Sequence, residues 1–413
     1  MENGAGHDVS TELFWRKLGG KALKLAPAPL FIFSSQPMAE AIRQLETLLE
    51  QEAPNLRFRH WLSFKTQPVP HLIRWWRDQG RPIEVVSEFE LQAALQEGFA
   101  PEDILVNGPA KHHWLPACAM PQLNVNFDSI SEMEALLPTA IKLNWRVGIR
   151  CRTRVEISTD STPVPSQFGM EPNEAATAIK RLQKSGARLE IMHFHLGTQI
   201  PKASIYGRAL DEIAAICRVA RFQPRFVDCG GGLPASGTSS KTGTPLAAEF
   251  SLRHWAGILS KTAEKIQGVE EIWLENGRRL SAGSGALALQ ILDIKERGNV
   301  RHLICNGGRT LHGMVSLWET HDLFPLEKRG GPRKLTVVNG PTCMTFDRLA
   351  VCRLPVSLRA GDHLLWLNAG AYHVSWETRF SHGHAAAVWH ENDRLQLARS
   401  RETFAEWWGK WRA

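Results

Sequence analysis

FVDCGGGLP, residues 226–234, is a short apolar run that ends in three consecutive glycines. Seven runs of the same kind occur at wide spacing, at residues 60–65, 83–86, 104–107, 123–127, 147–150, 191–196 and 272–276. Helix-like segments lie between them, as in SEFELQAALQEG (87–98), where Ser87 is an expected N-cap and Gly98 an expected stop. Alternating strands and helices indicate a parallel sheet, and this number of strands predicts a closed (β/α)8 barrel. An open, doubly wound sheet is the alternative, because short apolar runs are ambiguous.

The pattern changes after about residue 280. Short strand-like runs then follow one another without long helices, at residues 287–296, 301–305, 334–338, 352–358, 362–368, 385–390 and 394–398. We therefore expect an α/β protein with two domains, a barrel over 29–280 and an antiparallel β domain over 281–413. The run at 30–33 is expected to pair with the β domain, after a mobile lead-in at 1–28.

Two segments have an unusual composition. GTSSKTGTP (237–245) is rich in Gly, Ser and Thr and is expected to form a surface loop. ETFAEWWGKWRA (402–413) is rich in Trp and is expected to pack on the β domain rather than to anchor the chain in a membrane.

Composition excludes several classes of protein. Of 413 residues, 43% are hydrophobic and 22% charged, which is typical of folded, soluble proteins. The net charge is 49 − 42 = +7, which suits anionic ligands, and no nucleic-acid motif accompanies it. No apolar run is long enough to span a bilayer, and no signal peptide is expected. Seven cysteines without a CxxC pair favour a reducing, cytoplasmic location.

Several of the predicted barrel strands end in polar residues or glycines, or are followed by them. The carboxyl ends of the strands of such a barrel share one face, so these residues are expected to converge. They are Lys65, Glu84, Arg150, His195 with Thr198, the triple glycine at Gly230, Gly231 and Gly232, and Glu275 with Gly277 and Arg278. Missing side chains at the glycines would let backbone N–H groups approach a phosphate.

Each of these signals has a plainer interpretation. Lys65 alone could extend to solvent, and a triple glycine is often only a turn. His193 and His195 lie on one face of a strand and would suit a metal ion, but no cysteine or acid completes a ligand set in the sequence, so no metal is expected. Taken together, the residues describe a pocket for a phosphorylated carbonyl cofactor.

In this order, the motifs resemble the fold-type III pyridoxal-phosphate (PLP) decarboxylases. This group includes the diaminopimelate, ornithine and arginine decarboxylases and shares its barrel with alanine racemases. The motifs, which extend over most of the chain, are SFK (63–65), EVVSEFEL (84–91), NGPAK (107–111), FHLGTQ (194–199), DCGGGLP (228–234), ENGR (275–278), GPTC (340–343) and GAY (370–372).

The resemblance implies a role for each matching residue. Lys65 would bind the cofactor as a Schiff base, His195 would stack on its ring, and Glu275 would contact the ring nitrogen, which stays protonated beside a carboxylate. The phosphate would be held by Thr198, Gly230, Gly231, Gly232, Arg278 and Tyr372. Glu84, Arg150 and Gly277 would complete the cofactor site. The family works as a homodimer with shared sites, so Cys343 would act from the partner subunit.

Departures from the family pattern lie at the substrate end. Met344 stands where relatives carry an acid for the distal amine of the substrate. Met314 and Trp318 stand where diaminopimelate decarboxylases carry an arginine and a tyrosine, although Arg309 could bend in as a replacement. A charged distal group would be poorly bound there. We therefore expect a substrate without one, an amino acid or a conjugate from a natural-product or siderophore-type pathway.

Two other functions fit the same residues less well. A racemase or another PLP reaction at Cα would use the same cofactor site, but GPTC and ENGR follow the decarboxylase pattern. A non-catalytic regulatory relative would be expected to have lost cofactor residues, and those named above are retained.

Overall fold

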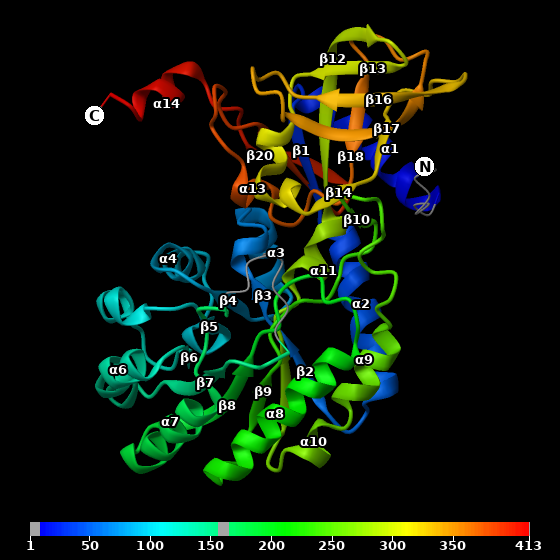
Figure 1. Cartoon of the computed structure of the whole chain (residues 1–413). Coiled ribbons are helices and arrows are strands. Elements are labelled where there is room, and N and C mark those ends of the chain that lie inside the picture. The colour runs from blue at the N-terminus through cyan, green and yellow to red at the C-terminus, as the bar shows by residue number, and fades with distance from the viewer. Residues whose placement is uncertain (1–8, 156–164, 413) are drawn as a thin grey trace.

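The computed structural model describes residues 9–155 and 165–412. It contains two sheets of nine strands, one in each domain, and a small sheet of two strands (Figure 1). The parallel sheet forms the lower part of the molecule in Figure 1, with helices around it. The second sheet forms the upper part, and the carboxyl-terminal helix projects from it.

The parallel sheet is the predicted barrel. Its order is β2-β11-β9-β8-β7-β6-β5-β4-β3, and every neighbouring pair is parallel. The strands are β2 (Arg57–His60), β3 (Leu62–Ser63), β4 (Ile83–Val85), β5 (Ile104–Val106), β6 (Asn124–Phe127), β7 (Arg146–Cys151), β8 (Arg188–Phe194), β9 (Phe226–Asp228) and β11 (Glu271–Leu274). Only Trp61 separates β2 from β3, so the two ends of the sheet belong to one interrupted strand and the barrel closes. The predicted barrel is thus confirmed.

Helices follow the strands as the alternating pattern predicts. They are α2 (Ser35–Glu52), α3 (Pro70–Asp78), α4 (Glu88–Gln96), α5 (Leu115–Cys118), α6 (Ile130–Lys142), α7 (Pro172–Ser185), α8 (Ser204–Ala220), α9 (Leu252–Leu259), α10 (Thr262–Lys265) and α11 (Gly277–Ser281). Short 3-10 turns are η1 (Phe64–Thr66), η2 (Pro101–Asp103), η3 (Lys111–His113), η4 (Ala282–Ser284) and η5 (Gly313–Leu317). Ser87 caps α4, since its side chain accepts a bond from the N–H of Glu90, and Gly98 follows that helix at φ +85°.

The second sheet has the order β17-β16-β13-β12-β1-β19-β20, with β18 paired to β12 and β15 to β18. Its strands are β1 (Leu30–Ser34), β12 (Gly285–Arg297), β13 (Val300–Cys305), β15 (Leu323–Pro325), β16 (Arg333–Asn339), β17 (Arg348–Pro355), β18 (His363–Trp366), β19 (Ala386–Glu391) and β20 (Arg394–Arg399). The pairs are antiparallel except β1 with β19 and β13 with β16. Helices α12 (Arg309–His312), α13 (His373–Trp376) and α14 (Phe404–Gly409) accompany this sheet.

The expected mobile lead-in is wrong for residues 9–25, which form helix α1 (Val9–Leu25). Trp15, Leu18 and Ala22 are buried in one apolar cluster with residues of β1, β12 and β18. The helix contains Gly19 and Gly20, which disfavour helical structure locally. Packing compensates, because a side chain at Gly19 would meet Leu365 at 3.1 Å. Residues 1–8 lie outside the described part.

The expected loop at 237–245 is also wrong in part. Residues 238–240 form β10 (Thr238–Ser240), which pairs with β14 (Glu319–His321) of the other domain. A polar three-residue strand carries no apolar alternation, so its partner decides its structure.

The Trp-rich tail packs only loosely. Trp407 donates to the carbonyl of Arg379 at 3.2 Å, but Phe404 is 75% exposed.

No helix in the described ranges is long and apolar enough to cross a membrane.

Candidate active site

The residues expected at the strand ends converge on one end of the barrel. Lys65 lies in η1, directly after β3, and Glu84 lies in β4. The Nζ of Lys65 donates to both carboxylate oxygens of Glu84, at 2.7 and 3.0 Å. Burial lowers the pKa of Lys65, but the charges of Glu84, Tyr372 and Glu275 outweigh it and raise the pKa above its usual value. Without a bound cofactor, Lys65 is therefore held as an ammonium ion.

Glu84 is one of several buried carboxyl groups that lie close together beside this lysine. Glu275, which follows β11, accepts a bond from the amide of Asn107 at 2.5 Å. Asn107 also donates to Glu84 at 3.3 Å. Burial, followed by the negative charges of Asp228 and Glu84, raises the pKa of Glu275 well above its usual range. A cation placed beside Glu275 would reverse this effect and favour the carboxylate.

Histidines line the same pocket. The Nδ1 of His195 accepts a bond from the N–H of Gly231 at 3.2 Å and lies 3.8 Å from a carboxyl oxygen of Glu275. Burial, with the positive charges of Arg150 and Lys65, lowers the pKa of His195 to about 3. His195 is therefore a neutral ring over the working pH range, which suits stacking on a flat ligand.

The glycine run forms a tight cradle after β9. Gly230 and Gly232 have φ values of +60° and +102°, a region that favours glycine. A side chain at Gly231 would lie 2.5 Å from the carbonyl oxygen of Glu275. Only bare backbone fits here, so a phosphate could be approached closely by main-chain N–H groups.

Arg278, in α11, lies beside Thr198 and Tyr372. Its Nε donates to Thr198 at 3.2 Å, its Nη1 binds Glu319, and its guanidinium lies 4.6 Å from the centre of the Tyr372 ring. Gly277 cannot carry a side chain, because a Cβ would lie 2.6 Å from Thr66. An arginine, a hydroxyl group and bare backbone are the donors that phosphate recognition uses, so this part of the site fits a phosphorylated cofactor.

Arg150 lies at the edge of the site, in β7. Its Nη1 is 3.7 Å from a carboxylate oxygen of Asp128, and its guanidinium lies over the ring of Phe168. Arg150 is near enough to His195 for its positive charge to lower the pKa of that histidine. Within the described part of the chain, Arg150 makes no contact with the glycine cradle.

An aromatic group lies at the expected substrate end, around Trp318. The Trp318 and Trp376 rings meet edge to face at 5.7 Å, and Trp376 stacks on Tyr372 at 5.1 Å. Ser375, next to Trp376, donates to the carbonyl of Lys65 at 2.5 Å. The aromatic pair is therefore connected to both the lysine and the phosphate side of the pocket.

Other residues expected at the substrate end take up different positions. Arg309 is already engaged, since its Nε donates to Ser316 at 2.6 Å and its Nη1 to the carbonyl of Phe346 at 3.4 Å. Met344 is half-buried and Cys343 exposed, on the segment between β16 and β17. Met314 lies in η5, but its side chain is outside what the structure describes.

Sequence reasoning missed several residues of the site. Asn107 and Asp228 lie within the NGPAK and DCGGG motifs, so their place in those motifs was an available signal. Glu319 and Trp376 carry no such signal, because they reach the site from the β domain. Acids also lie beside His193 where the sequence offered none for a metal site: Asp228 and Glu275 place their ligand atoms within 4.8 Å of it and of one another.

Two further features lie outside the predicted site. One is a second buried group of side chains with metal-ligand atoms, His312, His321 and His373. In it, His312 Nδ1 lies 2.7 Å from His373 Nε2, a hydrogen-bond distance.

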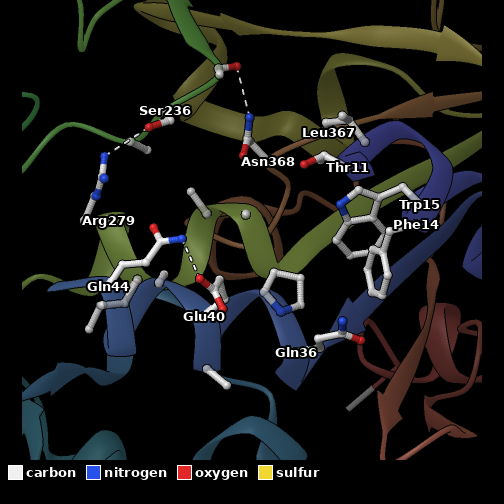
Figure 2. Close-up of a pocket in the computed structure, with 18 of the residues that line it drawn as sticks. Thr11, Phe14, Trp15, Gln36, Glu40, Gln44, Ser236, Arg279, Leu367 and Asn368 are labelled. Atoms are coloured by element: carbon white, nitrogen blue, oxygen red, sulfur yellow. Dashed lines mark hydrogen bonds between the residues drawn. The ribbon is translucent and has the colours of Figure 1, made fainter. Parts of the chain in front are cut away.

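The other is a cavity of about 680 Å³ between α1, α2 and α11. Figure 2 shows Trp15 at one end of it and Arg279 with Ser236 at the other. None of the predicted site residues lines it, and Arg279 is bonded to Ser236 at 3.1 Å.

A parallel barrel with a lysine at a strand end, a glycine cradle and a β domain alongside defines the barrel class of PLP-dependent enzymes. Residues 39–282 match the family described as "Pyridoxal-dependent decarboxylase, pyridoxal binding domain". The chain belongs to this family and is a PLP-dependent amino-acid decarboxylase of fold type III.

Individual relatives agree with this assignment. The chain is 28% identical to diaminopimelate decarboxylase of Aquifex aeolicus over 394 residues, 91% of this chain and 90% of that protein. Diaminopimelate decarboxylase of Helicobacter pylori, solved with L-lysine, has a TM-score of 0.80 at 22% identity and covers 95% of this chain and 99% of its own. A lysine/ornithine decarboxylase of Vibrio vulnificus, solved with cadaverine, has a TM-score of 0.74 at 20% identity, with 91% and 98% covered.

Proposed function

We propose that this decarboxylase acts on an amino acid, or an amino-acid conjugate, whose distal end carries no charge, in a natural-product or siderophore-type pathway. The observation that carries the proposal is the Trp318–Trp376 pair beside Tyr372, with Met344 in place of an acid. An unpaired ammonium or carboxylate desolvated against such groups would cost more than the roughly 2–7 kcal/mol that an unbonded neutral polar group costs. Diaminopimelate, the substrate that the relatives' names indicate, carries charge at its distal end and is the main alternative.

The position of Arg309 supports the proposal. For a charged substrate, this arginine would have to replace the missing distal recognition. Its guanidinium instead binds Ser316 and the carbonyl of Phe346 and lies 5.7 Å from the centre of the Phe346 ring. Turning it toward the site would break these bonds.

The proposed roles of the residues follow from their contacts. Lys65 binds the cofactor, and Glu84 holds its amine in place until then. His195 lies against the ring as a neutral imidazole, and Glu275 keeps the proton on the ring nitrogen. When bound, the cofactor supplies the ring that takes up the electron pair left by loss of CO₂. Either the Cys343 thiol or the Lys65 ammonium group then returns a proton to Cα.

We also propose a homodimer, in the cytoplasm, with sites shared between subunits. Cys343 is exposed and belongs to the β domain, which agrees with a thiol that serves the neighbouring subunit. All seven cysteines are free thiols, which agrees with a reducing compartment.

The experiment is a matched substrate panel that follows CO₂ release by the protein reconstituted with PLP. Each charged amino acid is paired with its distally acylated form, for example ornithine with Nδ-acetylornithine and lysine with Nε-acetyllysine, and meso-diaminopimelate is included. We expect turnover of distally neutral compounds and little turnover of their charged parents. Efficient decarboxylation of meso-diaminopimelate, ornithine or arginine would refute the proposed specificity.

Lys65→Ala is the control for the panel. The wild type should show a visible absorption band that borohydride removes and fixes to Lys65, and the variant should show neither. If the band appears but no compound is decarboxylated, the cofactor site is correct and the substrate class is wrong.

A further inference from the structure

Glu319 is a buried carboxylate that reaches the cofactor site from the β domain. It lies in β14, and its side chain is only 1% exposed. Its two oxygens accept bonds from Arg278 Nη1 at 2.9 and 3.1 Å and from Gln199 Nε2 at 2.9 Å. His321 Nε2 lies 3.0 Å from the same carboxylate. Four donor contacts therefore hold one carboxylate that none of the sequence motifs contains.

His321 is a further partner of Glu319. Its Nδ1 lies 2.9 Å from the carbonyl oxygen of Leu367, and its Nε2 faces Glu319. Burial alone would raise the pKa of Glu319, but the bond from His321 and the charge of Arg278 outweigh it and lower the pKa to about 2. The contacts with Arg278, Gln199 and His321 thus favour the carboxylate form of Glu319.

The contacts of Arg278 show which of its N–H groups Glu319 engages and which it leaves for a ligand. A guanidinium has five N–H donors in a fixed plane. Nε is directed to Thr198 and Nη1 to Glu319, while Tyr372 packs against the guanidinium. Among the described residues, Nη2 has no hydrogen-bond partner. Its two N–H groups are the ones left for an anion, on the Thr198 side of the cradle.

Glu319 is also linked, through Gln199, to the loop that follows the glycine run. Gln199, which binds Glu319, accepts a bond from the N–H of Ala235 at 3.2 Å, just after the glycine run. The β10–β14 pair places Glu319 opposite Ser240 in the same region. The arginine and the loop that follows the glycines are therefore both tied to one carboxylate.

We propose that Glu319, braced by His321 and Gln199, is a positioning residue that orients Arg278 toward the cofactor phosphate. This inference rests on the proposed role of Arg278 as a phosphate ligand. Glu319 itself touches neither cofactor nor substrate, and a carboxylate near a phosphate would repel it unless its charge were compensated as it is here.

The test compares PLP with pyridoxal, which lacks the phosphate, by titrating each into the apo form of the full-length protein and following visible absorbance. Glu319→Gln removes the charge and keeps the size. We expect the dissociation constant of PLP to rise roughly 10- to 100-fold, as for loss of a hydrogen bond to a charged group. Binding of pyridoxal should be unchanged.

Two controls separate positioning from a general loss of stability. Asp362→Asn removes another carboxylate of the β domain that binds an arginine, Arg329, at 2.9 Å, and it should leave both ligands unaffected. Glu319→Asp keeps the charge but shortens the side chain, so it should also weaken PLP selectively. This variant provides the test if Glu319→Gln does not fold.

The remaining outcomes decide the inference. Unchanged or tighter PLP binding in the Glu319 variants, or equal weakening of PLP and pyridoxal, would overturn it. Arg278→Gln distinguishes this failure from failure of the proposed site. If Arg278→Gln weakens PLP selectively and the Glu319 variants do not, only the role of Glu319 is wrong. If Arg278→Gln has no selective effect, the phosphate assignment is wrong as well.

Discussion

Single residues in this barrel differ in protonation because burial acts in opposite directions on acids and bases. Burial raises the pKa of Glu275 and lowers that of His195, although the two side chains are 3.8 Å apart. Burial thus disfavours the charged form of each group before the cofactor binds. A cationic ring nitrogen beside Glu275 would favour its charged form.

His60 allows the same effect to be measured without the cofactor. It ends β2, is buried, and neither ring nitrogen has a partner among the described residues. Burial lowers its pKa from 6.5 to about 4 in the folded chain. Since only the unfolded chain takes up this proton between those values, the wild type should lose stability relative to His60→Gln as the pH falls from 6.5 to about 4. The loss should reach about 3 kcal/mol.

Urea unfolding of the two proteins at several pH values measures this difference. Above pH 7, His60 is neutral in both states, so the difference between the proteins should be constant there. A difference that stays constant down to pH 4.5 would show that His60 titrates normally in the folded chain.

At the scale of elements, α1 shows how packing can outweigh local preference. The helix contains two adjacent glycines, yet its inner face joins the apolar cluster of the β domain through Trp15, Leu18 and Ala22. It therefore belongs structurally to the β domain, although it precedes the barrel in the chain. Figure 1 shows α1 beside that sheet, at the top of the molecule.

Trp15→Ala should therefore destabilise the chain by about 3–5 kcal/mol, because it removes a large side chain that is only 2% exposed. Leu13→Ala is the matched control in the same helix, since Leu13 is 58% exposed and should change stability by less than about 0.5 kcal/mol. Denaturant unfolding measures both. Equal effects of the two substitutions would mean that α1 does not pack through this face.

At the scale of the whole molecule, the proposed dimer places Lys65 and Cys343 of one site on different chains. With the Cys343 thiol as the group that returns the proton to Cα, Lys65→Ala and Cys343→Ala should each be nearly inactive alone. When the two variants are mixed and allowed to exchange subunits, one site in each mixed dimer regains both residues. Activity should return to about one quarter of the wild-type value under random pairing.

Decarboxylation by the mixture, on a substrate found by the panel, is the measurement. Mixing two batches of the same variant is the control and should restore nothing. If the mixed variants also remain inactive while native gels show that subunits have exchanged, Cys343 acts within its own subunit or not at all.

Much of the site could be predicted without coordinates. Lys65, Glu84, His195 and Glu275 each lie within two residues of the carboxyl end of a barrel strand, and the closed barrel brings strand ends to one face. The strand runs themselves are short and apolar, and this pattern depends only on neighbours in the chain. For these residues, local order in the sequence was enough to predict that they converge.

The rest depended on contacts between segments far apart in the chain. Glu319 meets Arg278 because β14 pairs with β10, and Trp376 meets Trp318 because α13 packs beside η5. Neither pairing has a period or a spacing that could be read along the chain. The fold class and the position of Lys65, the proposed cofactor lysine, thus followed from local patterns. Long-range packing decided the contacts of Arg278, the aromatic group around Trp318 and the helical state of residues 9–25. The stabilising energy comes from contacts between segments far apart in the chain, so no single segment predicts it.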